Sequence, residues 1–258
     1  MGLEGRVALI TGGGRGIGRG IAECLARDGA DIAVNFRRDE ASAVEMAHAA
    51  RALGRRAGHY QADVADWSAC EAMVAQVLKD FGKIDILVNN AGIASRGQSV
   101  TVTDPAEMER VVRTHAFSAF YLSKLVVPQM RTLGRGDVVM ISSSATKSLG
   151  ANGSPYNMGK AALEALAKTL AKEERVNNIR VNVVAPGLVE TEMGKRLARA
   201  TRGVADIRDL IPTSPFGLVC QPEDIGNAVA FLVSEQGRYI THEVLYVDGG
   251  GFPTPPKR

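Results

Sequence analysis

The stretch Thr11–Gly20, TGGGRGIGRG, follows the apolar run Val7–Ile10, VALI, and decides the fold. A turn with so few Cβ atoms, placed between an apolar strand and a helix, exposes backbone N–H groups that favour an anion. The pattern G-x-G-x-x-G fits no frame of the stretch, and a P-loop would need Lys and Ser or Thr where Arg19 and Gly20 stand. A different glycine-rich anion-binding turn is therefore predicted, with its usable glycines at Gly12, Gly16 and Gly18.

Composition is that of an ordinary globular chain. Of the 258 residues, 45% are hydrophobic and 23% charged, and the net charge of +3 is spread without a basic stripe that would indicate nucleic acid. No apolar run has the length of a membrane span, and the N-terminus MGLEGR lacks the apolar core of a secretion signal. The three cysteines, Cys24, Cys70 and Cys220, have no metal spacing, so we expect no metal site, buried thiols and a cytoplasmic protein.

Apolar runs of strand length alternate with segments of helical period along the whole chain. This alternation predicts an α/β fold: a single Rossmann-type, doubly wound parallel sheet of about seven strands, with helices on both faces. Ligands of such sheets bind beyond the carboxyl ends of the strands, where the glycine turn would lie. The expected strands are 6–11, 30–36, 57–62, 84–90, 137–143, 179–186 and 244–250. The expected helices are 18–29, 40–54, 67–82, 104–133 and 154–178, with C-caps at Gly29, Gly54, Gly82 and Asn177.

One segment departs from this rhythm. Residues 187–217 are polar and interrupted by prolines, with a short helical piece around TEMGKRLARAT. A long insertion at the ligand edge is typical of a substrate lid. We therefore expect one domain over residues 1–258 that carries a lid at 187–217.

Several short patterns occur in an order that resembles the short-chain dehydrogenase/reductase family over nearly the entire chain. They are Thr11-Gly12-x-x-x-Gly16-x-Gly18, Asp63-Val64, Asn89-Asn90-Ala91-Gly92, Ser143 with Tyr156-x-x-x-Lys160, and Pro186-Gly187 followed by Thr191. The resemblance implies hydride transfer between a nicotinamide cofactor and a carbonyl or secondary alcohol. The resemblance also implies that Ser143, Tyr156 and Lys160 are the catalytic residues.

The spacing of these residues suits that chemistry. Tyr156 and Lys160 lie one helical turn apart, and Ser154-Pro155 supplies an N-cap and a first helical residue. A nearby ammonium favours the phenolate, so we expect Lys160 to lower the tyrosine pKa and make it a usable acid or base. Ser143 ends a strand and can donate to a carbonyl oxygen, whereas strand alternation turns its neighbours Ser142 and Ser144 away.

The end of the second strand indicates the cofactor. NAD-preferring proteins place an acid there to bind the ribose hydroxyls, but this chain has Phe36 followed by Arg37 and Arg38. With Arg15 of the glycine turn, two guanidinium groups could hold a 2′-phosphate, which predicts NADP(H). The alternative is that Arg37 and Arg38 are solvated loop charges. Asp31 lies at the wrong end of the strand, and Asp39 and Glu40 begin the next helix.

The resemblance assigns further cofactor contacts by position. Asp63 and Val64 would hold the adenine, Asn90 and Gly92 would border the nicotinamide ribose, and Lys160 would bind the ribose hydroxyls. The remaining candidates lie in the glycine turn and after the sixth strand: Gly12, Gly16, Ile17, Gly18, Pro186, Gly187 and Thr191.

Two residues depart from the family pattern. His115 stands where most relatives carry an asparagine that holds a water in the proton path. Either His115 is a packing residue, or its imidazole takes over the proton path and adds an acid limb near pH ~6.5, pushed lower by Lys160. His242 follows Thr241 where relatives have glycine, which would alter the last loop.

The nearest branch by resemblance is that of the 3-oxoacyl-acyl-carrier-protein reductases. The alternatives are 3-hydroxyacyl-CoA, steroid and sugar or polyol dehydrogenases, and, from another class, a non-catalytic NADP-binding sensor. Relatives commonly form homotetramers through the elements that here read KAALEALAKTLA, residues 160–171, and VLYVDGG, residues 244–250. The expected partners are a small-molecule substrate, which could be linked to an acyl carrier, and further copies of the chain in a homotetramer.

Overall fold

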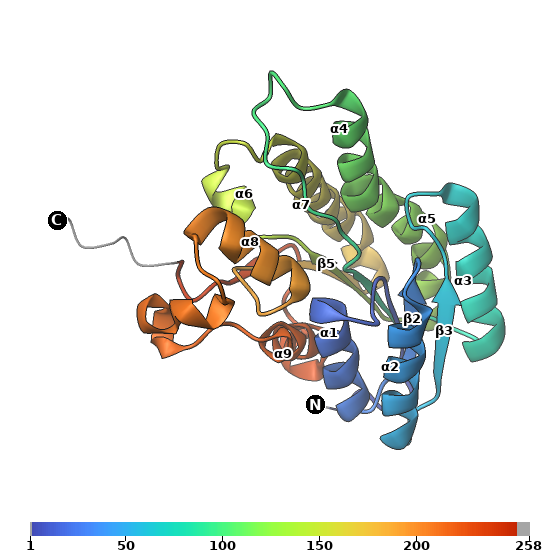
Figure 1. Cartoon of the computed structure of the whole chain (residues 1–258). Coiled ribbons are helices and arrows are strands. Elements are labelled where there is room, and N and C mark those ends of the chain that lie inside the picture. Colours follow the sequence, from blue (N-terminus) through green and yellow to red (C-terminus); the bar gives the residue numbers. More distant parts are fainter. Residues whose placement is uncertain (1, 252–258) are drawn as a thin grey trace.

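The computed structural model describes residues 2–251 and contains one parallel sheet covered by helices on both faces (Figure 1). The strand order β3-β2-β1-β4-β5-β6-β7 places the point of reversal between β1 and β4. All seven expected strands are present. The inner strands are buried, and buried parallel strands have continuous apolar sequences. The strands are β1 Val7–Ile10, β2 Asp31–Phe36, β3 Ala57–Gln61, β4 Ile86–Asn89, β5 Gly136–Ile141, β6 Ile179–Pro186 and β7 Val244–Val247.

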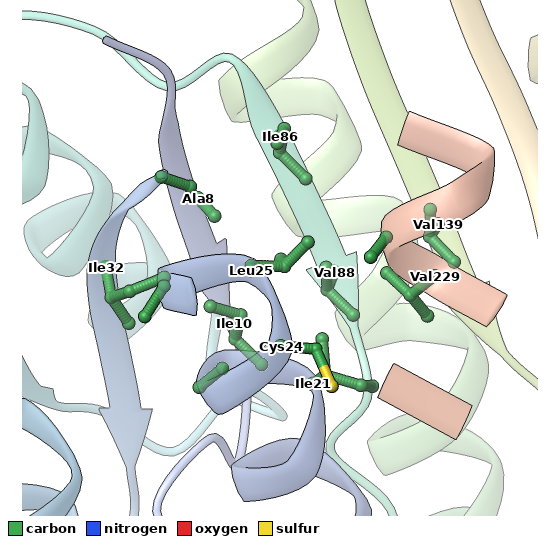
Figure 2. Packing of buried hydrophobic residues seen from close by; sticks show 14 of the residues in the cluster. Ala8, Ile10, Ile21, Cys24, Leu25, Ile32, Ile86, Val88, Val139 and Val229 are labelled. Atoms are coloured by element: carbon green, nitrogen blue, oxygen red, sulfur yellow. The ribbon is translucent and has the colours of Figure 1, made fainter. Parts of the chain in front are cut away.

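The helices pack on the two faces of the sheet and form a separate hydrophobic core on each face. One core packs α1 and α9 onto the sheet, with Ile21 and Leu25 of α1 against Ile10 and Val88 (Figure 2). The other contains the inner faces of α3, α5 and α7. The α-helices are α1 Gly16–Arg27, α2 Glu40–Ala52, α3 Trp67–Phe81, α4 Pro105–Val112, α5 Ser118–Met130, α6 Ala145–Ser148, α7 Ser154–Glu174, α8 Glu192–Arg202 and α9 Pro222–Val233.

Helix boundaries follow the capping signals with small corrections. Gly29, Gly54 and Gly82 have the expected positive φ, but at the end of α7 the left-handed residue is Asn178 rather than Asn177, because a 3₁₀ turn extends the helix by three residues. At its start α7 is capped by Gly153, one residue before the expected Ser154.

The expected helix 104–133 is helical but irregular. It consists of α4, a π-turn over Arg113–Phe117, α5 and a final 3₁₀ turn. The π-turn inserts one extra residue into the ladder, and such turns are common at functional sites. It contains His115.

The segment 187–217 has the length of the expected lid and forms α8 with two 3₁₀ segments, Ile207–Thr213 and Pro215–Gly217. Ala198, Ile207 and Leu210 of this segment form a small cluster with Val219, whereas Val189 belongs to the core under α1 and α9. The helix α8 of this segment is drawn in orange in Figure 1.

The cysteine prediction holds in part. Cys24 and Cys70 are buried, but Cys220 is partly exposed. No helix within residues 2–251 is long and apolar enough to cross a membrane.

Candidate active site

The carboxyl edge of the sheet collects the residues that the sequence singled out. β1 leads into the glycine turn, β4 into Asn90 and Gly92, β5 into Ser143, and β6 into Gly187 and Thr191. Because all strands are parallel, these segments lie at one edge.

The glycine turn has the shape that backbone contact with an anion requires. Gly12 and Gly16 have φ values of +61° and +54°, which disfavour any other residue. A Cβ on Gly18 would lie 2.3 Å from the Gly12 carbonyl oxygen. No side chain caps the N-terminus of α1, whereas Asp39, Asp66 and Asp104 cap other helices of the described chain. The turn therefore fits a pyrophosphate group.

The loop after β4 is tied to this turn. Asn90 Nδ2 donates to the Thr11 carbonyl oxygen at 2.8 Å, and the backbone N–H groups of Asn90 and Ala91 both donate to Thr11 Oγ1 at 2.9 Å. Thr191 packs against the other side of the turn, where a Cβ on Gly16 would lie 3.4 Å from its methyl group.

Two arginines border the edge next to β2 and β3. Arg37 lies 3.5 Å from Asp63, and Arg15 lies 3.7 Å from Asp39, which caps α2 as expected. Both pairs are exposed, and such pairs contribute about 0–1 kcal/mol. The guanidinium groups are thus available to a phosphate, while the Phe36 side chain turns into the core.

The catalytic candidates meet at the start of α7. The Ser143 hydroxyl lies close enough to Tyr156 to lower its pKa, and the Lys160 ammonium lies 5.8 Å from the Tyr156 ring centroid. The ammonium donates to the Ile141 carbonyl oxygen at 2.7 Å. Three side chains from β5 and α7 therefore converge on one point.

The electrostatics differ from the expectation in one respect. Burial raises the pKa of Tyr156, and the interaction with Ser143 only partly offsets this. The ammonium is held by Ile141 and is itself buried, which lowers the pKa of Lys160 to about 8. The protein alone therefore keeps Tyr156 protonated, which suits a proton donor.

His115 also reaches this site, and its Nε2 lies 2.9 Å from the Ile93 carbonyl oxygen. Burial, together with Lys160, lowers the pKa of His115 to about 2. Lys160 lowers the pKa of His115, as expected. A pKa this low places an acid limb of His115 below the neutral range.

The other departure, His242, keeps the conformation that a glycine would adopt. Its φ is +71°, and its N–H donates to the Val181 carbonyl oxygen at 2.8 Å. The histidine therefore carries the strain of a left-handed residue, on the order of 1–3 kcal/mol.

Sequence reasoning missed Glu164. Its Oε1 accepts hydrogen bonds from Ser142 Oγ and Thr146 Oγ1, which flank Ser143 on both sides. Ser142 thus turns away from the site as expected. The sequence does indicate this residue, because Glu164 follows Lys160 by four residues and so lies on the same face of α7.

Comparison with known proteins shows the family of this chain. Residues 12–251 match a family model described as enoyl-(acyl carrier protein) reductase, within the short-chain dehydrogenases/reductases. The 3-oxoacyl-[acyl-carrier-protein] reductase of Escherichia coli (strain K12) is 36% identical over 250 residues, which cover 97% of this chain and 98% of that protein. The chain belongs to the short-chain dehydrogenase/reductase family, a family of oxidoreductases that use nicotinamide cofactors.

Solved structures show the same fold with different ligands. A 7α-hydroxysteroid dehydrogenase complexed with NADH and 7-oxo glycochenodeoxycholic acid superposes with a TM-score of 0.89 at 32% identity, covering 97% of this chain and 95% of that one. The L-sorbose reductase of Gluconobacter frateurii complexed with NADPH and L-sorbose gives 0.88 at 33% identity, covering 96% and 97%.

Proposed function

We propose that this protein is an NADP(H)-dependent reductase or dehydrogenase of the 3-oxoacyl-acyl-carrier-protein reductase type. The convergence of Ser143, Tyr156 and Lys160 beside an uncapped glycine turn is the observation that carries the proposal. The cofactor, when bound, supplies or accepts the hydride. In the reductive direction the Ser143 hydroxyl donates to the carbonyl oxygen, and the Tyr156 hydroxyl gives that oxygen its proton as the carbonyl becomes an alcohol.

Exposed apolar side chains favour an apolar carbonyl compound over a polyol. Met193 and Leu197 of α8 and Phe216 and Leu218 near the end of the lid segment remain exposed, although the segment contributes to a small apolar cluster. Where exposed apolar side chains form a contiguous patch, they mark a ligand or partner contact. A 3-oxoacyl thioester or a ketosteroid is therefore the better candidate, and a ketose the weaker one.

Turnover with NADPH tests the function. We expect oxidation of NADPH by a 3-oxoacyl thioester or a 3-oxosteroid at a higher kcat/KM than by L-sorbose. Tyr156→Phe removes the proton donor and should lower kcat about 10²–10⁴-fold while NADPH still binds. Binding of NADPH without turnover of any carbonyl would instead identify a sensor.

Cofactor preference is a separate prediction. We expect NADPH to be used more efficiently than NADH, because Arg37 and Arg15 offer two cations and no acid ends β2. Arg37→Asp should invert the preference, since it removes a cation and adds a ribose ligand that repels the 2′-phosphate. Arg175→Asp, in the 3₁₀ turn before β6 at the opposite edge of the sheet, is the charge-matched control. Equal efficiencies in the native protein would contradict the proposal.

A further inference from the structure

His115 occupies a closed space between two parts of the candidate site. It belongs to the π-turn, is 1% exposed, and directs Nε2 to the backbone of Ile93, 3.0 Å from the N–H nitrogen and 2.9 Å from the carbonyl oxygen. A neutral imidazole nitrogen either donates or accepts, so one of these two contacts is made at a time. In both cases the ring is fastened to the loop that follows β4.

The other side of the ring faces the catalytic helix. The imidazole meets the Tyr156 ring edge-on, with centroids 5.1 Å apart and an interplanar angle of 87°. Its Nδ1 is buried and has no hydrogen-bond partner among the described residues. The ring thus bridges the loop and α7 through one hydrogen bond and one packing contact.

Two glycines leave just enough room for this ring. A Cβ on Gly159 would lie 3.0 Å from Nδ1, and a Cβ on Gly92 would lie 3.2 Å from Nε2. Both distances are shorter than ordinary van der Waals contact. Gly159 sits between Tyr156 and Lys160 in α7, so any displacement of the ring acts directly on the catalytic pair.

We propose that His115 is a positioning residue that holds the Gly92–Ile93 loop and Tyr156 at a fixed separation, and that Gly92 and Gly159 are glycines because the imidazole needs their space. The inference rests on the proposed role of Tyr156. It assigns the imidazole no proton transfer.

The surrounding charges agree with this role. Lys160 and Tyr156 are the titratable groups that face the ring from α7, and the Lys160 ammonium would lie 3.6 Å from the same Gly92 Cβ. The loop Asn90–Ile93 contributes no charge, and Arg113 of the π-turn is exposed over Phe117. Burial and Lys160 hold the pKa of His115 far below neutrality, so the ring stays uncharged at working pH.

A double-mutant cycle of Gly159→Ala and His115→Asn tests the proposal. In the native background Gly159→Ala should lower kcat by tenfold or more, because the methyl group pushes the imidazole against Tyr156. In the His115→Asn background the same change should cost less than threefold, since the smaller side chain leaves room. Gly150→Ala is the matched control, because a Cβ there meets nothing within 4 Å. Equal effects of Gly159→Ala in both backgrounds would overturn the proposal.

A second measurement needs no turnover and separates this inference from the proposed function. The ring nitrogens and Cε1–H of His115, followed by NMR, should not titrate between pH 5 and pH 8. NADPH affinity should fall several-fold in His115→Ala and recover in part in His115→Asn, because the loop after β4 loses and regains a hydrogen-bonding side chain. Titration near pH ~6.5 would show that the imidazole carries a proton and would overturn the positioning role. Failure of every carbonyl substrate, with these results unchanged, would refute the function alone.

Discussion

The Glu164 carboxylate binds the segment that contains Ser143. It accepts from Ser142 and Thr146, the latter at 2.8 Å, and Thr146 Oγ1 also lies 2.9 Å from the Ser143 carbonyl oxygen. We expect Glu164→Leu to lower the free energy of unfolding by about 1–3 kcal/mol, because the Ser142 hydroxyl loses its acceptor and the Thr146 hydroxyl keeps only the Ser143 carbonyl oxygen. It should lower kcat more than it raises KM. Glu164→Gln keeps an acceptor oxygen and should stay within threefold of native kcat. Denaturant unfolding and steady-state kinetics of both variants test this. If Glu164→Gln lost as much stability and kcat as Glu164→Leu, the negative charge of Glu164 would be needed, and an acceptor oxygen alone would not suffice.

Lys160 makes stability depend on pH in a definite direction. Its pKa falls from 10.5 in the unfolded chain to about 8 in the folded protein. Between these values the unfolded chain binds the proton and the folded one does not, so stability rises with pH in this window. Below pH 8 both states are protonated, and the folded state bears the full cost of the buried charge. Relative to Lys160→Met, the native protein should gain on the order of 3 kcal/mol in free energy of unfolding from pH 7.5 to pH 10.5. A constant difference across that range would contradict a buried ammonium.

At the scale of single residues, the sequence located the site but not its electrostatics. The spacing of Tyr156 and Lys160 placed both side chains on one helix face, because the helix repeat is fixed. That spacing could not reveal that the ammonium donates to the Ile141 carbonyl oxygen, or that burial raises the pKa of Tyr156. Such partners come from another strand and become visible only in the folded chain.

Among the elements, α9 was absent from the expected helices, although its start carries a clear signal. Gln221 and Asp224 form a capping box around Pro222 at the first helical position. The π-turn at Arg113–Phe117, in contrast, has no sequence signal, because an apolar helix face looks the same with one residue inserted. The inner strands were predictable because they are buried and mostly apolar, whereas the edge strands β3 and β7 are only partly buried.

The contact between α1 and α9 depends on glycine. A Cβ on Gly20 would lie 2.5 Å from the backbone carbonyl of Pro222, and one on Gly226 would lie 2.5 Å from the Gly20 carbonyl oxygen. Gly20→Ala should therefore lower the free energy of unfolding by about 1–3 kcal/mol, because the two helices must separate. Chemical denaturation measures this, with Gly150→Ala as a control whose added methyl group meets open space. Comparable stability of the two variants would show that α9 can shift without cost.

On the scale of the whole molecule, apolar side chains gather on the outer face of α5 and α7. Phe117 and Phe120 are about half exposed, at 46% and 52%, and a shallow groove between them and Leu166 runs along Ala162 of α7. This is the KAALEALAKTLA face. Within residues 2–251, β7 is the edge strand of the sheet, and its Leu245 is exposed. A soluble monomer rarely exposes such apolar patches.

We expect a second copy of the chain to cover the α5 and α7 face and another to meet β7, which gives a homotetramer of closed symmetry. Ala162→Arg places a charge in the middle of the helical face and should halve the assembly, because a buried unpaired guanidinium is strongly unfavourable. Leu53→Arg, at an exposed position after α2 on the opposite face of the sheet, is the matched control and should leave the mass unchanged. Sedimentation velocity over a hundredfold range of concentration measures the mass of the assembly for both variants. A native protein that sediments as a monomer at every concentration would refute the assembly, and the apolar groove would then need another partner.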